Sequence, residues 1–570
     1  MWRYVPPLRE MRFVIEEVLR IPERWPVLQG RAEIDIETAL HVLEEAGRFA
    51  AEVIGPINAA GDFEGCSFSD GQVCTPAGYR QALRAFVDAG WPLLACDEED
   101  GGQALPHVLS AALNEMLAAA NHAWTMYPGL AEGAYRCLKA HARQDIKDRY
   151  LGKIAAGEWL ATMCLTEPQA GSDLGAVCTR AAPAGDGTWQ VTGSKIFTSG
   201  GEHDLTDNIV HLVLCRLPDA PAGGKGLSLI LVPKVLPDGK RNAVRCDGIE
   251  KKMGIKGSAT CVMSFEQATG WLIGQPHCGL AAMFVMMNSA RLHVALQGVA
   301  HLEAATQNAI RYANERTQFG AALSAQLSVR RTLWRLKALT SGARVCAFRI
   351  AQLLDEADYH RSAAERERAQ QLLGVLTPIA KAFFTHVGHH GANDALQVWG
   401  GYGYVHDYGI EQTVRDSRIA MIYEGANAIQ AIDLVTRKVI ADGGHAMELL
   451  LEEMDSEVVV CRAVEGLEMH AETLQRQVRQ LRGGVDQLLH SAGSQWPIQV
   501  ADDFLHGAGF TLLTWAWCRI ARATSVARSG DLHGEQWQAS DFGIRHVLPE
   551  SEAHWQRLGA GECELPAIAD

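Results

Sequence analysis

The segment TWQVTGSKIFTS, residues 188–199, opens the part of the chain that decides the fold. NIVHLVLC (208–215), LSLILVP (227–233) and ATCVMSF (259–265) follow it, separated by Gly, Pro and Asp. Such short, β-rich runs predict about six or seven strands. The helical connections that a parallel sheet requires are absent from this region. We therefore expect an antiparallel barrel or sandwich.

Helical periodicity flanks this β-domain on both sides. Before it, Ile36, Leu40 and Leu43 share one helical face, and after Gly274 the same three-to-four spacing returns. The pattern predicts an α+β fold in four parts. These are an N-terminal helical domain (1–158), the central β-domain (159–274), a helical bundle (275–445), and an additional C-terminal region (446–570). In the last, a helical block over 446–528 is followed by a polar tail.

Composition excludes several classes of protein. The chain has 570 residues, 48% of them hydrophobic, and its 52 basic and 67 acidic residues give a formal charge of −15. It should be globular, and without a Lys/Arg run it should not bind nucleic acid. The fourteen cysteines form no CxxC pairs, and we identify no His-rich clusters at metal spacing, which favours a reduced, cytoplasmic protein without a metal site. The longest apolar stretches, such as 279–287 and 510–518, are too short to span a membrane.

Two segments carry candidate chemistry. In CLTEPQAGSD (164–173), Ala170 and Gly171 are small, and side-chain hydrogen bonds are offered by Thr166, Ser172 and Asp173. Such a loop can lie flat against a ligand, although an ordinary turn has the same composition. Glu424 is the only ionisable carboxyl in AMIYEGANAI (420–429). Desolvation raises the pKa of a carboxyl towards the working pH and makes it a better general base. A glutamate at a helix N-terminus is the plainer alternative for Glu424.

These two segments occur together with KIFTSG (195–200), KMGIKGS (252–258), ERTQFG (315–320) and QVWGGYG (397–403). In this order and at roughly this spacing, over residues 30–445, they resemble the acyl-CoA dehydrogenase family. The extended N-terminus and the C-terminal block resemble the long subgroup that includes 3-methylmercaptopropionyl-CoA dehydrogenase. The resemblance implies a helical, β and helical core that binds FAD and oxidises an acyl-CoA thioester to a trans-2-enoyl-CoA.

The resemblance also implies which residues contact FAD. Those expected are Leu165, Thr166, Gly171, Ser172, Phe197, Ser199, Arg316, Gln318, Phe319, Gln397, Gly400 and Gly401. Phe197 and Ser199 stand where the family usually has Trp and Thr, and Ala426 replaces a family Thr that would offer FAD a hydroxyl. In relatives, the Arg316 segment reaches the FAD pyrophosphate of a neighbouring subunit. A helix C-terminus capped by Gly320 would also place an Arg there.

By the same resemblance, Glu424 is the catalytic base, and the expected substrate-binding residues are Ser172, Arg291, Tyr423, Glu424 and Gly425. A solvated helix charge is the alternative for Arg291. The implied partners are acyl-CoA, electron-transferring flavoprotein and a second copy in a homodimer or homotetramer. Two rivals stay open: a flavin oxidase of the same fold, and a DNA-associated relative with a basic C-terminal region. Against them stand Glu424, where the oxidases carry Asp, and the mixed charges of residues 446–570.

Overall fold

The structure is a computed structural model that describes residues 2–31, 33–525 and 531–562. The chain forms two compact units. The first consists of Met1–Gln29, Glu33–Glu44 and Val294–Asp570, and the second of Gly30–Ala32 and Glu45–His293. Two helices, α2 (Ile36–Phe49) and α8 (Gly279–Glu315), contain residues of both units.

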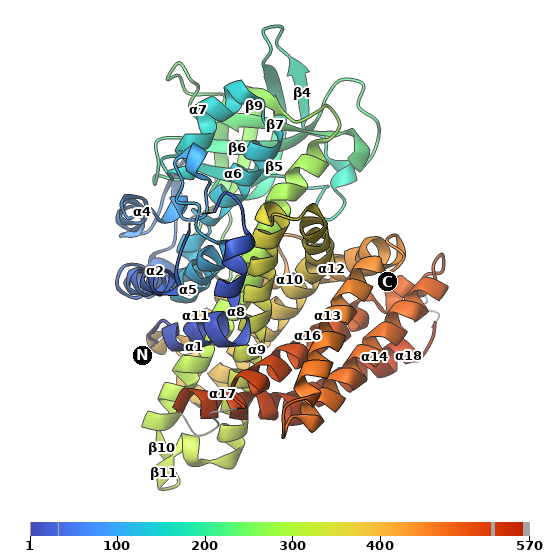
Figure 1. Ribbon diagram of the computed structural model, residues 1–570. Helices are drawn as coiled ribbons and strands as arrows, with labels where there is room; N and C mark the ends of the chain where they lie inside the picture. The colour runs from blue at the N-terminus through green and yellow to red at the C-terminus, as the bar shows by residue number, and fades with distance from the viewer. Residues whose placement is uncertain (1, 32, 526–530, 563–570) are drawn as a thin grey trace, which may run out of the picture. The chain divides into compact units, whose positions relative to one another are not determined.

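Helices and one hairpin precede the sheet in the second unit (Figure 1). They are α3 (Asn58–Glu64), β1 (Ser67–Ser69), β2 (Gln72–Cys74), α4 (Tyr79–Asp88), α5 (His107–Thr125), α6 (Gly129–His141) and α7 (Gln144–Ala155). α5 is buried along almost its whole length. Its Trp124 packs edge-on against Phe86 of α4, with the ring centroids 5.4 Å apart. This aromatic contact fastens α4 to the central helix of the unit.

The seven strands of the main sheet confirm the predicted β-domain. They are β3 (Leu160–Cys164), β4 (Arg180–Pro183), β5 (Trp189–Ser199), β6 (Ile209–Arg216), β7 (Leu227–Pro233), β8 (Val244–Ile249) and β9 (Thr260–Ile273). The order is β3-β6-β4-β5-β9-β7, β8 pairs with β9, and pairing of β6 with β7 closes a barrel. The expected antiparallel pairing holds except that β6 runs parallel to β3 and β4. Those parallel pairs join strands that are not consecutive in the chain, so no tight turn has to connect them.

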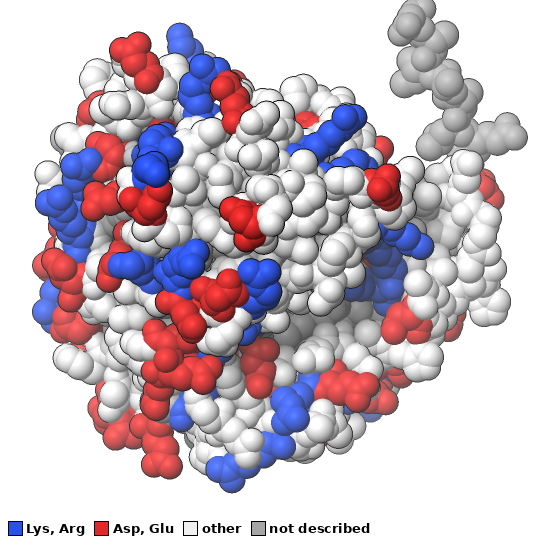
Figure 2. All heavy atoms as spheres, turned by 90° about the horizontal axis from the view of Figure 1, so that it is seen from above, with Lys and Arg blue, Asp and Glu red and all other residues white. Residues whose placement is uncertain are grey.

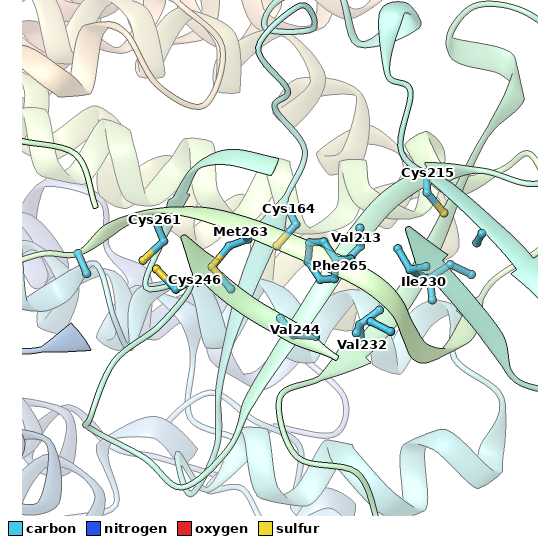
Figure 3. Close-up of a cluster of buried hydrophobic side chains, with 14 of the residues drawn as sticks. Cys164, Val213, Cys215, Ile230, Val232, Val244, Cys246, Cys261, Met263 and Phe265 are labelled. Atoms are coloured by element: carbon cyan, nitrogen blue, oxygen red, sulfur yellow. The ribbon is translucent and has the colours of Figure 1, made fainter. Parts of the chain in front are cut away.

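Alternation along β9 builds the core of this barrel (Figure 3). Cys261, Met263 and Phe265 are buried, and they lie in one cluster with Val213 of β6 and Ile230 of β7. Successive strand residues point to opposite sides, so every second residue reaches the same core. The barrel therefore has a hydrophobic core of its own.

Long helices form the first unit's bundle: α8, α9 (Leu327–Tyr359), α10 (Ala363–Trp399), α11 (Ile410–Arg418) and α12 (Asn427–Asp433). α10 begins where Ser362 accepts a hydrogen bond from the backbone N–H of Glu365, as expected of an N-cap. α8 is apolar and long enough to cross a membrane by length and composition, but 61% of its most apolar window is buried inside the structure. A core helix of a globular protein has the same properties.

The predicted C-terminal helical block is present in the first unit and extends further than expected. It contains α13 (His445–Arg462), α14 (Glu468–His490), α15 (Trp496–Gln499), α16 (Ala501–Ala523), α17 (Asp531–Phe542) and α18 (Ser551–Gly559). α17 and α18 lie in the segment for which the sequence predicted only a polar tail. Trp555 anchors α18 by donating a hydrogen bond from its indole N–H to Gln477 of α14 over 3.3 Å. One large buried side chain thus holds a short helix that polar composition alone would not predict.

Candidate active site

The CLTEPQAGSD loop is fixed to β5 by a buried ion pair. The Nζ atom of Lys195 lies 2.8 Å from the Glu167 carboxylate and 2.8 Å from the carbonyl oxygen of Leu165. Burial would raise the pKa of Glu167, but the hydrogen bonds from Lys195 and from the Cys178–Thr179 segment hold it at about 2. The backbone N–H of Ile196 donates to the carbonyl oxygen of Thr166. Loop and strand therefore present one continuous surface.

A bulge in β5 turns Phe197 outward. The pairing of β5 with β9 shifts register between Lys195 and Thr198, and Phe197 has φ +56°. Its ring is 59% exposed. A non-glycine residue in this left-handed region is strained, and bulges often re-aim side chains beside functional sites. An exposed ring held in a strained position suits stacking against a planar ligand.

The remaining expected residues of the second unit differ in burial. Gly171 and Ser172 are exposed, whereas Leu165, Thr166 and Ser199 are half-buried. A Cβ atom added at Gly171 would meet nothing within 4 Å. Arg291 on α8 is 7% exposed, with its guanidinium 5.7 Å from the centroid of the Phe284 ring. A solvated helix charge is therefore the wrong interpretation of Arg291.

Glu424 lies in a turn before α12 rather than inside a helix. It has φ +53°, and Gly425 follows with φ +85°. The side chain of Gln430 donates to the carbonyl oxygens of Glu424 (3.1 Å) and Gly425 (3.3 Å). A Cβ atom added at Gly425 would lie only 2.5 Å from Nε2 of Gln430. Glycine is thus required next to Glu424, because any side chain would displace this contact.

A buried lysine is hydrogen-bonded to the same turn. The Nζ atom of Lys381, in α10, donates to the carbonyl oxygen of Gly425 over 2.7 Å and to Oδ1 of Asn427 over 3.1 Å. Lys381 is 0% exposed. Burying an ammonium group is costly unless it is fully hydrogen-bonded. The contact therefore fixes the position of the Glu424 turn relative to α10.

Tyr423 links this turn to α8 through a hydrogen bond from its hydroxyl to the side-chain oxygen of Gln297. Burial raises the pKa of Tyr423, and the neighbouring Glu424 charge raises it further. The phenol stays protonated at neutral pH and keeps donating to Gln297. Glu424 itself is half-buried.

The Arg316 segment is a hairpin, not a capped helix end. α8 ends at Glu315, and the two short strands β10 (Thr317–Gln318) and β11 (Ala321–Ala322) follow. Phe319 and Gly320 form the turn between them with φ +54° and +77°, as tight hairpin turns require. Gly320 is therefore not the helix cap that the sequence suggested as an alternative. Phe319 is 96% exposed at the tip.

The glycine-rich stretch after α10 lies beside this hairpin. The guanidinium of Arg316 lies 5.5 Å from the centroid of the Tyr402 ring, and Tyr312 stacks on Trp399 with the ring centroids 4.2 Å apart. Gln397, Gly400 and Gly401 are exposed there. Added Cβ atoms at the two glycines would meet nothing within 4 Å. The first unit thus brings Arg316 and the exposed glycines to one surface.

Family models match most of the chain. The N-terminal, middle and C-terminal domains of acyl-CoA dehydrogenase match residues 36–158, 162–268 and 277–439. The chain belongs to the acyl-CoA dehydrogenase family. It is 38% identical to the 3-methylmercaptopropionyl-CoA dehydrogenase of Ruegeria pomeroyi, over 97% of this chain and 98% of that protein. The broad-specificity linear acyl-CoA dehydrogenase FadE5 of Mycobacterium tuberculosis is 35% identical, over 78% of this chain and 77% of its own length.

Solved structures have the same fold. The structure of Caenorhabditis elegans ACDH-11 in complex with C11-CoA superimposes with a TM-score of 0.78 at 18% identity, covering 96% of this chain and 92% of that one. The Bacillus anthracis acyl-CoA dehydrogenase complexed with FAD superimposes with a TM-score of 0.75 at 19% identity, covering 94% of this chain and 90% of that one. The predicted family and fold class are confirmed. The enzyme is a flavoprotein oxidoreductase with FAD as its cofactor.

The residues present fit a flavin. Phe197 offers an exposed ring, Ser199 a half-buried hydroxyl and Gly171 an unobstructed backbone. Sequence reasoning missed the residues that hold these groups in place, chiefly Lys195 and Lys381. Lys381 has no local signal. Lys195 is the only charged residue in its strand, β5. A lone lysine there should have indicated a buried partner.

Proposed function

We propose that Glu424 is the base that removes the α-proton of a bound acyl-CoA. FAD, when bound, accepts the β-hydrogen as a hydride and so supplies the oxidising chemistry. The substrate loses one proton and one hydride, a double bond forms between its α- and β-carbons, and the product is a trans-2-enoyl-CoA. The proton passes to the Glu424 carboxylate.

The geometry of the Glu424 turn carries this proposal. Its left-handed φ is strained, and hydrogen bonds from Gln430 and Lys381 hold the carbonyl oxygens of Glu424 and Gly425. Strain that the surroundings enforce at a carboxylate marks a functional position. A base held this firmly stays within reach of one C–H bond, and such fixed orientation lowers the activation barrier of proton removal. The Glu424 backbone N–H would donate to the thioester oxygen and stabilise the developing enolate.

The flavin-binding roles follow the family pattern. We assign the pyrimidine edge of the ring to the Leu165, Thr166, Gly171 and Ser172 loop, and N5 to the Ser199 hydroxyl beside Phe197. Arg316, Gln318, Phe319, Gln397, Gly400 and Gly401 would hold the pyrophosphate and adenine of FAD in the other copy of a homodimer. The exposure of Phe319 and of both glycines supports this, because they are free to meet a second chain.

The proposed substrate is a short or medium acyl-CoA, with 3-methylthiopropionyl-CoA as the first candidate. The support is the Ruegeria relative, which is 38% identical over 97% of this chain. Ser172, Tyr423 and Gly425 would line the thioester, and Arg291 would help hold the CoA moiety. Electrons would leave through electron-transferring flavoprotein in the cytoplasm.

The test is a panel of acyl-CoA thioesters mixed with the FAD-loaded enzyme without oxygen, scored by bleaching of the flavin. 3-Methylthiopropionyl-CoA and butyryl-CoA should give a higher kcat/KM than palmitoyl-CoA, since that ratio measures discrimination. A higher kcat/KM for palmitoyl-CoA would contradict the proposed short or medium acyl-CoA substrate. Turnover with oxygen alone, at the rate seen with electron-transferring flavoprotein, would indicate an oxidase instead.

A duplex-binding role has little support. Over the face in Figure 2, acidic and basic side chains are interspersed rather than gathered into a basic patch. A salt-dependent shift of duplex DNA in a gel would nevertheless reveal it.

A further inference from the structure

A buried amide side chain orients the peptide group between Glu424 and Gly425. Gln430 is 0% exposed, and its Nε2 atom donates to the carbonyl oxygens of Glu424 over 3.1 Å and of Gly425 over 3.3 Å. Only the nitrogen of an amide side chain can donate. The two carbonyl oxygens therefore decide which end of the Gln430 amide faces the turn.

The same contacts determine where the backbone N–H of Gly425 points. In a planar trans peptide, this N–H is directed away from the carbonyl oxygen of Glu424. Because that oxygen faces the buried side chain of Gln430, the N–H faces the opposite side of the half-buried turn. Among residues 2–31, 33–525 and 531–562, nothing accepts a hydrogen bond from it. The folded chain thus leaves this donor available to a ligand.

The backbone conformation of the turn brings this donor next to the N–H of Glu424. The chain is right-handed at Ile422 (φ −106°, ψ −51°) and has positive φ at Glu424 (+53°) and Gly425 (+85°). Successive N–H groups at such a change of hand converge into a concavity that attracts negative charge. The turn therefore offers two neighbouring donors to one acceptor atom.

The proposed reaction develops negative charge on an oxygen that can accept from more than one donor. Removal of the α-proton turns the thioester into an enolate, with the charge on the former carbonyl oxygen. Donors that are fixed in advance where charge develops stabilise the transition state more than the ground state. Three hydrogen bonds, two from Gln430 and one from Lys381, keep the carbonyl oxygens of the turn in place.

We propose that the N–H of Gly425 is a second backbone donor to the thioester oxygen, beside that of Glu424, and that Gln430 is the positioning residue that aims it. This inference rests on the proposed function, because it takes the thioester to lie against the Glu424 turn. It also explains why a wholly buried amide is bonded to two successive carbonyl oxygens at this point of the chain.

The experiment uses FAD-loaded enzyme saturated with acetoacetyl-CoA. The β-carbon of this probe carries an oxo group, so it has no hydrogen to transfer as a hydride. Its enolate, next to oxidised flavin, gives a long-wavelength absorption band, and the pH at which the band is half developed reports the pKa of the bound probe. A wild type that does not lower this pKa below that of free acetoacetyl-CoA would overturn the proposal.

Gln430→Met keeps nearly the same volume but removes both N–H donors, so the peptide is no longer held in one orientation. We expect the pKa of the bound probe to rise by about one to two units, a loss of about 10-fold to 100-fold in enolate stabilisation. With butyryl-CoA, kcat should fall by about the same factor while KM stays nearly unchanged, as for an interaction made in the transition state.

Gln477→Met is the matched control, because Gln477 is another wholly buried glutamine of the first unit and bonds to Trp555. It should lower the thermal midpoint and leave the probe pKa and kcat as in the wild type. If Gln430→Met does not retain FAD, Gln430→Asn tests the same contacts. Its amide is one methylene shorter and cannot keep both hydrogen bonds, so the probe pKa should rise here too. A Gln430 variant that loses stability but keeps the wild-type probe pKa would overturn the proposal.

Failure of this inference is distinguishable from failure of the proposed base. The probe ionises at equilibrium, so its pKa does not depend on which group removes the α-proton. A raised probe pKa in Gln430→Met, together with wild-type bleaching of Glu424→Gln by butyryl-CoA, would remove the base and keep the Gly425 donor. An unshifted probe pKa with an inactive Glu424→Gln would keep the base and remove the donor.

Discussion

The ammonium group of Lys381 lies 2.7 Å from the carbonyl oxygen of Gly425, the residue directly after Glu424. The two residues are 44 positions apart in the chain. The lysine is wholly buried, and its ammonium group is hydrogen-bonded by this carbonyl and by the side-chain oxygen of Asn427. A core helix thus sets the position of the proposed base through one side chain.

Lys381→Met should lower kcat while leaving KM and FAD content nearly unchanged. The methionine keeps the volume but leaves the Gly425 carbonyl without this donor, so the Glu424 turn is held less firmly. Misplacement of a reacting group by about 1 Å costs up to roughly 100-fold in rate, and we expect a loss of about 10-fold to 100-fold. The measurement is steady-state kinetics with butyryl-CoA and an artificial electron acceptor.

Lys438→Met is the matched control, because Lys438 lies in the same unit after α12. It should keep full activity. If Lys381→Met lost stability and activity in proportion, with kcat restored on cooling, the lysine would serve the fold alone and not the position of Glu424.

Glu424→Gln should bind FAD as the wild type does and fail to be reduced by any acyl-CoA. The amide has nearly the same shape but cannot take the α-proton, and general bases contribute about 10²-fold to 10⁴-fold. Stopped-flow bleaching of the flavin measures the step directly. Glu424→Asp, with a shorter reach, should retain a small part of the rate. Bleaching of Glu424→Gln at the wild-type rate would remove Glu424 from the role.

Arg316→Ala should weaken FAD binding by about 10-fold to 100-fold, since a charge-assisted hydrogen bond contributes about 1.5 to 3 kcal/mol. If Arg316 reaches FAD in a second copy, dilution should make the defect worse. The measurement is an FAD titration at two protein concentrations, with light scattering for size. Arg437→Ala, a 68% exposed arginine of the same unit, is the control. A monomeric wild type that keeps its flavin would contradict the shared site.

The sequence predicted the fold class because its signals are local and periodic. Alternation along β9 brings Cys261, Met263 and Phe265 to one side, and that alternation is readable without a structure. The parallel pairing of β3 with β6 was not readable, because it depends on which distant strands meet. α17 and α18 were missed since their stability comes from contacts such as Trp555 with α14, not from their own pattern.

The sequence indicated which residues form the candidate site but not the backbone conformations that they adopt. The residue types of Phe197 and Glu424 indicated their roles, whereas their positive φ angles arise from a bulge and from the hydrogen bonds of Gln430 and Lys381. The expectation of no metal site rested on the absence of CxxC pairs and of His-rich clusters at metal spacing, which are local patterns. The contact of His386 with His506 arises only through tertiary packing.

A half-buried ion pair between α8 and α6 predicts how stability depends on pH. His293 lies 3.2 Å from the Glu132 carboxylate of α6. Burial alone would lower the pKa of His293, but the Glu132 charge and hydrogen bond raise it above the usual value. Burial would likewise raise the pKa of Glu132, yet His293, with help from His107 and Arg136, holds it at about 2. Each partner therefore stays charged over a wider pH range when folded than when unfolded.

The raised pKa of His293 contributes stability that is complete below its unfolded pKa of about 6.5 and is lost as the pH rises through the folded value. The lowered pKa of Glu132 contributes stability that is present above about 4.5 and is lost as the pH falls towards 2. The pair therefore stabilises most between about pH 4.5 and 6.5. His293→Gln should cost about 1 to 3 kcal/mol there, because a half-buried pair contributes less than a fully buried one, and less at pH 9.

The measurement is the thermal midpoint of wild type and His293→Gln at pH 5.5, 7.5 and 9, followed by release of flavin fluorescence. Groups that titrate in both proteins cancel in the difference between the two midpoints, so its change with pH reports the pair. His41→Gln, at an exposed position, should show no such change. A midpoint difference that stays constant from pH 5.5 to 9 would mean that His293 is neutral throughout, and that its contact with Glu132 is a hydrogen bond without a charge on the imidazole.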